Sequence, residues 1–98
     1  MIKQTPVKGA RKVKVSFALP KESVTGHVSV VGEFNDWDPL AHPLRPRSNG
    51  TRSVTVTLPV SQRFAFRYLD ENGNWLDDDA ASEYVDNGIG GINSVVHT

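Results

Sequence analysis

Two tryptophans stand in stretches that otherwise have the composition of loops. Trp37 lies in GEFNDWDPLAHPLRP, residues 32–46, among turn formers, charges and prolines, and Trp75 follows an Asn-Gly-Asn turn signal. A ring in such a stretch either caps the core or stands exposed as a contact surface. The aspartates on both sides of Trp37 favour a solvated loop and therefore a contact surface. Trp75 could equally begin a strand and pack against Tyr84.

Acidic residues gather after Trp75 and raise the question of catalysis. Hydrolysis of a glycosidic bond needs two carboxyl groups about 5–10 Å apart across a cleft. Three aspartates on one turn offer no such cleft, so a solvated turn is the favoured interpretation and an enzyme is not expected. The histidines lie far apart and predict no metal cluster, and no motif predicts a cofactor. The residues concerned are Asp77, Asp78, Asp79, Glu83 and Asp86, and His27, His42 and His97.

The composition describes one ordinary globular domain. The 98 residues include eleven basic and eleven acidic ones, so the formal net charge is zero. We therefore expect no steering field, and we expect no nucleic acid as the main partner, because phosphate contacts need a basic excess. Cysteine is absent, and no stretch has the character of a signal peptide or a membrane span. A cytoplasmic location with no membrane partner is the resulting expectation.

Apolar residues alternate with period two over most of the chain, which is typical of strands with one buried face. Short strands between turn signals predict an all-β fold, an antiparallel β-sandwich. Lys12 and Lys14 indicate that the first strand is an edge, and residues 77–85 could form at most one helical turn. The strands are expected at 12–17, 27–34, 53–58, 63–69 and 93–97, and the buried residues at Val15, Phe17, Val28, Val30, Val54, Val56, Phe64, Phe66 and Tyr68.

Four motifs in this order resemble carbohydrate-binding module family 48. They are GEFNDW at 32–37, FAFRYL at 64–69, NGNW at 72–75 with acidic residues behind it, and NGIGGINSVV at 87–96. That family includes the glycogen-binding domain of the AMP-activated protein kinase β subunit and the early-set domains of isoamylases and branching enzymes. The resemblance implies an immunoglobulin-like β-sandwich over residues 11–98, preceded by a flexible segment, residues 1–10.

The resemblance also implies a non-catalytic module for α-1,4-glucans such as glycogen, starch and malto-oligosaccharides. A pyranose presents a flat face of C–H groups on which an aromatic ring can stack, while polar groups meet its hydroxyls. On the family pattern, Trp37 and Trp75 are the stacking rings, Arg67 and Asn93 bond hydroxyls, and Ile89 replaces a leucine that enters the ring of the glucan. Strand parity independently places Arg67 opposite the buried face of its strand.

Alternative interpretations of the site and of the function remain open at this point. Gly91 stands where the kinase domain has a threonine, so one hydroxyl contact of that pattern is missing. Arg67 could be a solvated cation, and Asn93 could satisfy turn backbone groups, as asparagines beside glycines often do. The alternative function is a non-binding accessory domain whose partner is an α-amylase-type enzyme that processes glucans.

Overall fold

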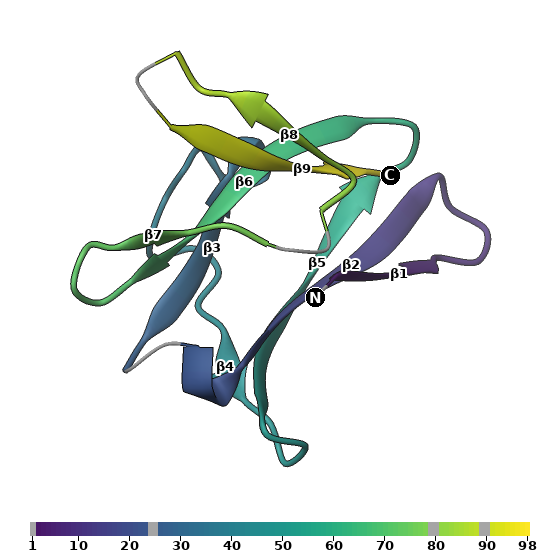
Figure 1. The fold of residues 1–98 in the computed structure, drawn as a ribbon. Helices are drawn as coiled ribbons and strands as arrows, with labels where there is room; N and C mark the ends of the chain where they lie inside the picture. The colour runs from purple at the N-terminus through teal and green to yellow at the C-terminus, as the bar shows by residue number, and fades with distance from the viewer. Residues whose placement is uncertain (1, 24–25, 79–80, 89–90) are drawn as a thin grey trace.

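The structure is a computed structural model that describes residues 2–23, 26–78, 81–88 and 91–98. Within them the chain forms two antiparallel β-sheets packed as a sandwich, with two single-turn 3-10 helices and no α-helix (Figure 1). The all-β sandwich predicted from the sequence is thus confirmed. The elements are β1 (Ile2–Pro6), β2 (Lys12–Pro20), η1 (Lys21–Ser23), β3 (Val28–Gly32), η2 (Glu33–Asn35), β4 (Arg45–Pro46), β5 (Thr51–Pro59), β6 (Arg63–Asp70), β7 (Trp75–Leu76), β8 (Glu83–Asp86) and β9 (Ile92–His97).

The first sheet has the strand order β1-β2-β5-β4. β2 is buried at every second residue, which places its lysines on the outward face. The expectation that this lysine-rich strand is an edge was wrong, because β1 pairs with one side of it and β5 with the other. Ile2–Pro6 therefore belongs to the sheet, although residues 1–10 were expected to form a flexible segment. The lysines lie on the outward face of a central strand and do not protect an edge.

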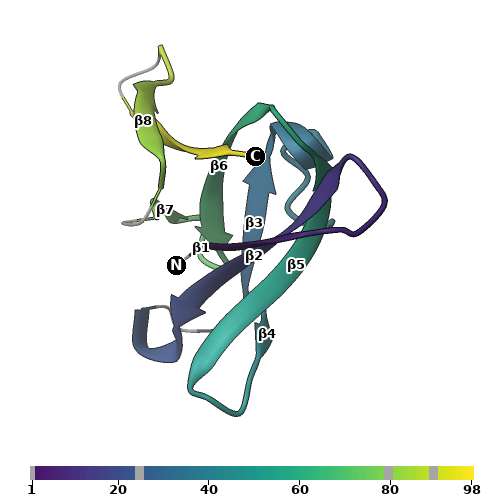
Figure 2. The same ribbon diagram turned by 90° about the vertical axis from the view of Figure 1, so that its right-hand side faces the viewer.

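The second sheet has the order β3-β6-β9-β8, and β7 pairs with β6. β6 is its centre: β3 lies along one edge, while β9 and then β7 share the other edge. In Figure 2, β1, β2 and β5 lie in front of β3 and β6, so the two sheets face each other across the core. The outward side chains of β6 therefore point away from the first sheet.

The core between the sheets confirms the predicted strand parity. Seven of the nine residues predicted as core are buried, and the other two, Val54 and Phe64, are partly buried and pack against the same cluster. Phe17 of β2 contacts Phe66 of β6 edge to face, with ring centroids 4.9 Å apart. Such aromatic contacts stabilise the sandwich beyond the area that they bury. Leu44, outside the predicted strands, also joins the core.

Strand β8 was not predicted from the sequence. Residues 77–85 were expected to form one helical turn at most; Glu83–Asp86 is a strand and pairs with β9. Tyr84 and Asn93 occupy neighbouring strands as a result. No helix among the described residues has the length and apolar character needed to cross a membrane.

Candidate functional site

The loop that carries Trp37 begins with a glycine that steric packing requires. Gly32 ends β3 directly against β6, and a Cβ at this position would lie 2.5 Å from the backbone oxygen of Ala65 and 2.8 Å from the Cβ of Phe66. Both distances are shorter than a non-bonded contact allows, so only glycine fits without a shift of the backbone. The chain can therefore leave the sheet close to its centre.

The side chain of Asn35 then fixes the loop. Its Oδ1 accepts the backbone N–H of Gly32 at 3.0 Å, and its Nδ2 donates to the carbonyl of Val30 at 3.1 Å. The N–H of Trp37 donates to the carbonyl of Gly32 at 2.9 Å, which closes the turn. Asp36 and Trp37 both have left-handed backbone angles, with φ of 55° and 58°. Such angles are unfavourable for a bulky side chain, and the closed turn holds Trp37 in a position where the residue is 37% exposed.

Trp75 is positioned by the turn between β6 and β7. The carboxylate of Asp70 accepts hydrogen bonds from the backbone N–H groups of Asn72 and Asn74. These bonds, that from the Asn74 N–H first, lower the pKa of Asp70. Gly73 supplies the left-handed residue of the turn, with φ of 83°. Trp75 then pairs with Leu69 at the start of β7. It begins a strand, as one interpretation of the sequence expected, yet it stays 47% exposed.

Arg67 projects from the outward face of β6 between the two aromatic segments. Its guanidinium lies over the ring of Trp75, with the Cζ atom 5.3 Å from the ring centroid. Its Nε donates to Oδ1 of Asp77 at 3.2 Å, and only 18% of the Arg67 side chain is exposed. A cation–π contact and an ion pair on a partly desolvated side chain restrict its rotamers. Arg67 is thus held next to Trp75, with guanidinium N–H groups left to donate.

The turn between β8 and β9 completes the site. The register that pairs Phe66 with Ser94 places Asn93 beside Arg67 on the outward face. Asn87 exchanges hydrogen bonds with Gly91, since its N–H donates to the Gly91 carbonyl and its Oδ1 accepts the Gly91 N–H. A Cβ on Gly91 would lie 2.9 Å from Nδ2 of Asn87. The missing side chain at position 91 therefore leaves room for the amide group of Asn87.

These segments meet around one surface pocket of about 250 Å³. Four of the five residues predicted from the sequence line it, and Ile89 lies outside the described residues. Asn87 also lines it. The sequence interpretation included this residue in the 87–96 motif but assigned it no role in binding. A larger hollow of about 380 Å³ lies beside Leu40 and Leu69, but neither tryptophan lines it. The pocket residues are Trp37, Arg67, Trp75, Asn87 and Asn93.

The acidic residues after Trp75 have structural partners. The expectation of a solvated turn was wrong for Asp78, because this residue is only 1% exposed. Its Oδ2 accepts the hydroxyl of Tyr68 at 2.6 Å, and its backbone N–H donates to Oγ of Ser94 at 3.0 Å. The hydroxyl of Tyr84 donates to the Asp78 carbonyl. A buried carboxylate needs such partners, so Asp78 anchors the segment between β7 and β8 to the core.

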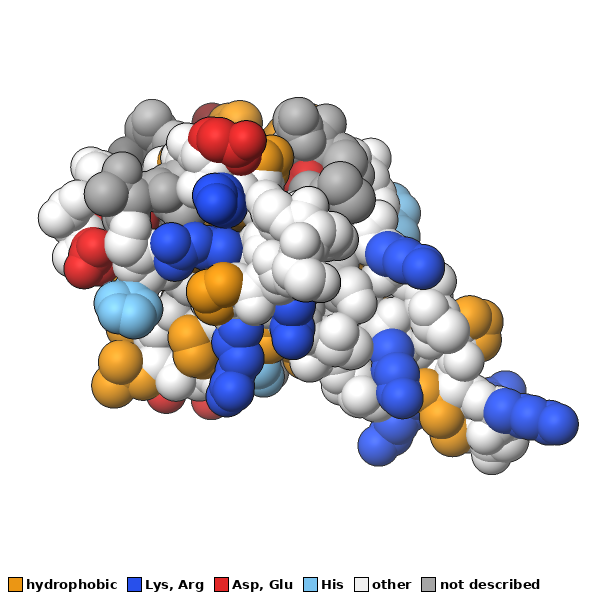
Figure 3. All heavy atoms as spheres, turned by 90° about the horizontal axis from the view of Figure 1, so that it is seen from below, with side chains coloured by type: hydrophobic (Ala, Val, Ile, Leu, Met, Phe, Trp, Pro, Cys, Tyr) orange, Lys and Arg blue, Asp and Glu red, His pale blue; other side chains and the backbone are white. Residues whose placement is uncertain are grey.

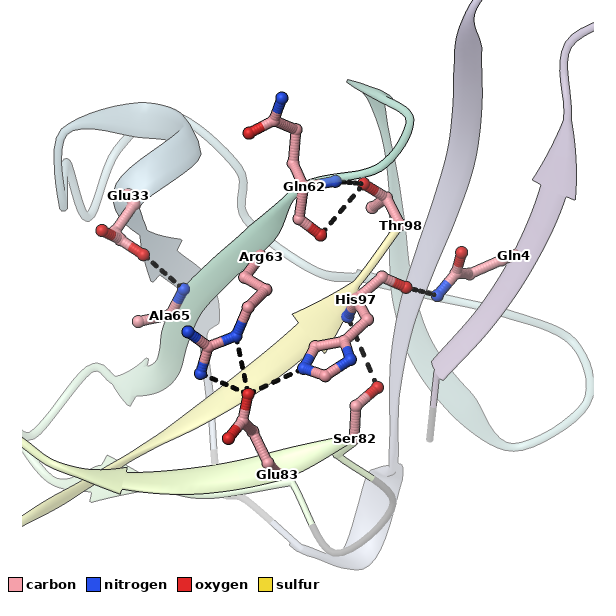
Figure 4. Close-up of polar contacts among 9 residues, drawn as sticks. All are labelled: Gln4, Glu33, Gln62, Arg63, Ala65, Ser82, Glu83, His97 and Thr98. Atoms are coloured by element: carbon pink, nitrogen blue, oxygen red, sulfur yellow. Dashed lines mark hydrogen bonds and ion pairs between the residues drawn. The ribbon is translucent and has the colours of Figure 1, made fainter.

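Glu83 is engaged at the other end of β8. Its Oε1 accepts hydrogen bonds from His97 and from the guanidinium of Arg63 (Figure 4). These contacts, with that of His97 the larger, lower the pKa of the Glu83 carboxyl. Asp77 is paired with Arg67. Among the described residues, the acids of this segment thus serve ion pairs and hydrogen bonds and do not face each other across the tryptophan pocket.

The fold and the pocket define a small β-sandwich domain with an aromatic and polar site on the outward face of one sheet. Half of the chain is similar to a small part of two curated enzymes. It is 38% identical over 50 residues to the 1,4-alpha-glucan branching enzyme GlgB of Nitrobacter hamburgensis, and 40% identical over 52 residues to GlgB of Deinococcus radiodurans. The matches cover 50% and 52% of this chain but only 7% of each enzyme. No family model matches the chain.

The matched stretch of those enzymes is thus a minor part of their length. The described residues of this chain form the two sheets and contain no catalytic barrel. The relation is therefore one between a β-domain and a region of a glucan branching enzyme.

Proposed function

We propose that this domain is a non-catalytic module that binds α-1,4-linked glucans in the tryptophan pocket. The observation that carries the proposal is the convergence of two half-exposed tryptophans, an arginine and two asparagines on one pocket from separate strands and turns. The named activity of the two relatives, branching of 1,4-α-glucan, points to the same class of polymer.

The pocket offers both kinds of contact that a sugar needs. The exposed faces of Trp37 and Trp75 can stack on the C–H faces of pyranose rings. The guanidinium of Arg67 and the amides of Asn87 and Asn93 can bond the hydroxyls at the rim of those rings. Two rings carried by separate turns can follow a curved α-1,4 chain, whereas a flat β-1,4 chain matches them less well. The preference for α-glucans is therefore part of the proposal.

Binding in this pocket should be weak for a single short oligosaccharide. The hollow is open, so much of each sugar stays in water, and ordering the chain opposes binding. We expect dissociation constants from micromolar to millimolar, or about −8 to −4 kcal/mol. A polymer with many chain ends presents the same ligand many times, which favours retention by glycogen over binding of one short chain.

Native gel electrophoresis in the presence of glycogen tests the proposal. The domain should migrate more slowly in a gel that contains glycogen and normally in a gel that contains a cellulose-type polymer. Leu40→Ala is the matched control, because Leu40 is 85% exposed and does not line the tryptophan pocket. Normal migration in both gels would contradict the proposal and favour an accessory domain that contacts a glucan-processing enzyme without binding the glucan itself.

A further inference from the structure

The net charge of zero hides a strong separation of charge between the two sheets. Nine of the eleven Lys and Arg residues lie in residues 1–23 and 44–59, the segments that build the first sheet, together with only one acidic residue. The remaining segments contain two Lys or Arg and ten acidic residues. The first part therefore carries a formal charge of +8 and the second −8. The expectation of no steering field does not hold for either part taken separately.

Basic side chains gather on the outward face of the first sheet, opposite the face that carries the tryptophan pocket. The strand pairing places three rows across it: Thr5 beside Lys14 and Thr57, Lys3 beside Ser16 and Thr55, and Ala18 beside Ser53 and Arg45. Short side chains form the centre of the face, and cations surround them. We call this surface the basic face, defined by Lys3, Lys12, Lys14, Arg45 and Arg47.

Most cations of the basic face have no ion-pair partner in the described part of the chain. Lys3, Lys12, Lys14 and Arg45 form no ion pair with any described residue. Arg47 is oriented by Ser53, to whose Oγ its Nε donates at 2.8 Å. Figure 3 shows the molecule from below. Lys and Arg side chains lie across the main body and along the narrow part that extends to the right. The unpaired positive charges are thus available to a partner.

A hollow on the basic face is lined by groups that can bind a carboxylate. It measures about 190 Å³ and is lined by two cations, three hydroxyl groups and an asparagine. Arg47 is held at its rim by Ser53, and Lys3 approaches from β1. Cations and hydroxyl donors around a small hollow are the groups that bind a carboxylate through charge-assisted hydrogen bonds. The lining residues are Lys3, Ser16, Ala18, Arg47, Asn49, Thr51 and Ser53.

We propose that the basic face is a docking surface for the acidic surface of another protein. An array of cations without ion pairs to other described residues attracts a surface of opposite charge and disfavours partners of like charge, which suits recognition of an acidic protein surface. The outward residues of β2 and β5 include no aromatic ring, so the face lacks the stacking platform that single-stranded nucleic acid uses. The major groove of duplex DNA admits a two-stranded β-ribbon as well as a helix, so duplex DNA is the competing polyanion in the test below. The hollow lined by cations and hydroxyl groups suits carboxylate groups, so an acidic protein is the occupant that the chemistry favours.

A second copy of this chain fits the face less well. Most acidic groups of the second sheet already accept internal hydrogen bonds. The carboxylate of Asp70 accepts hydrogen bonds within a turn, and the carboxylates of Asp77 and Glu83 are in ion pairs with arginines. Asp78 is buried. A contact between the first sheet of one copy and the second sheet of another would also be head to tail and would not close into a dimer. The partner is thus a different protein.

The test uses the full chain, immobilised poly-L-glutamate as an acidic polypeptide, and duplex DNA as a second polyanion. At low salt the wild-type chain should bind poly-L-glutamate more tightly than DNA, and the binding should weaken as ionic strength rises. The variant Lys12→Gln/Lys14→Gln removes two charges from the basic face and should lose about five-fold in affinity. The control Leu40→Asp/Asn72→Asp lowers the net charge by the same two units beside the second sheet and should change affinity less than about two-fold.

Each other outcome overturns the proposal. An equal loss in the two double variants would mean that net charge, and not the basic face, governs binding. Tighter binding to duplex DNA would assign the face to nucleic acid, and salt-dependent self-association that Lys12→Gln/Lys14→Gln abolishes would assign it to a second copy. Binding to neither probe at low salt would mean that the face is only a solvated surface. None of these results depends on the tryptophan pocket, so they leave the proposed glucan binding untouched.

Discussion

Replacing Trp75 by alanine should weaken glucan binding about ten-fold while the domain stays folded. A tryptophan side chain buries up to about 250 Å², and Trp75 is 47% exposed, so roughly 120 Å² is free for a ligand. A sugar ring on one face would cover about half of that area. At about 25 cal/mol per Å² this burial contributes about 1.5 kcal/mol, which corresponds to a factor of ten in the dissociation constant.

Isothermal titration with maltoheptaose measures this loss, and a thermal melt of the same sample shows whether the variant is folded. At the same value per Å², the part of Trp75 that the protein already covers contributes at most about 3 kcal/mol to the stability of the fold. The variant can lose that stability, so the titration must be done well below its melting temperature. Leu40→Ala removes an exposed apolar side chain outside the pocket and should leave the affinity unchanged. A folded Trp75→Ala chain that binds as tightly as wild type would refute the stacking argument.

Three further predictions concern the scaffold of the pocket. Asp70→Ala should lower the melting temperature at pH 7. The stability from the lowered pKa of Asp70 is present above the unfolded value near 3.9 and is lost as pH falls through the folded value, so the difference from wild type should narrow below about pH 4; a constant difference would count against this. Tyr68→Phe removes one partner of the buried Asp78 and should cost about 1–3 kcal/mol in urea unfolding, whereas an unchanged midpoint would mean that the bond contributes nothing. Gly32→Ala places a Cβ 2.5 Å from a β6 carbonyl oxygen and should destabilise the fold by about 1–3 kcal/mol; a neutral result would show that the loop can move.

The strands were predictable because one buried face imposes a period of two on the sequence. β2 and the second half of β5 alternate between buried and less buried residues, and the same parity in β6 predicts from the sequence alone that Arg67 lies on the outward face. The convergence of Trp37, Trp75 and Asn93 was predictable only through the family resemblance. Nothing in the local pattern of a strand says which distant turns meet above it.

Other features depend on partners that the sequence does not place. Asp78 lies in a run of aspartates that does not distinguish it from its neighbours. Its burial follows from contacts with Tyr68, Ser94 and Tyr84, which come from other strands. β1 is short and exposed, so it has no alternation to detect, and its strand character comes from pairing with β2. Lysines can lie on the outward face of a central strand as well as on an edge strand. The sequence alone does not say which strands pair with the one that carries them.

The charge distribution shows the same limit. A sum over the chain predicts no field, yet the strand order collects the basic segments in one sheet and leaves most acidic residues in the strands and loops around the other. Segment-by-segment charge can be read from the sequence, but which segments share a sheet follows from the fold. The basic face therefore depends on the pairing of β1, β2, β5 and β4, which the local sequence does not specify.

The most direct test of glucan binding follows the two indole N–H signals in a proton–nitrogen NMR spectrum during titration with maltoheptaose. The chain has two tryptophans, so each signal reports on one side of the pocket. If the pocket binds α-glucan, both indole signals should shift along one saturable curve together with the side-chain amides of Asn87 and Asn93, and an equal concentration of cellohexaose should shift none of them. Indole signals that stay in place at saturating maltoheptaose, or shifts confined to residues outside the pocket, would contradict the account.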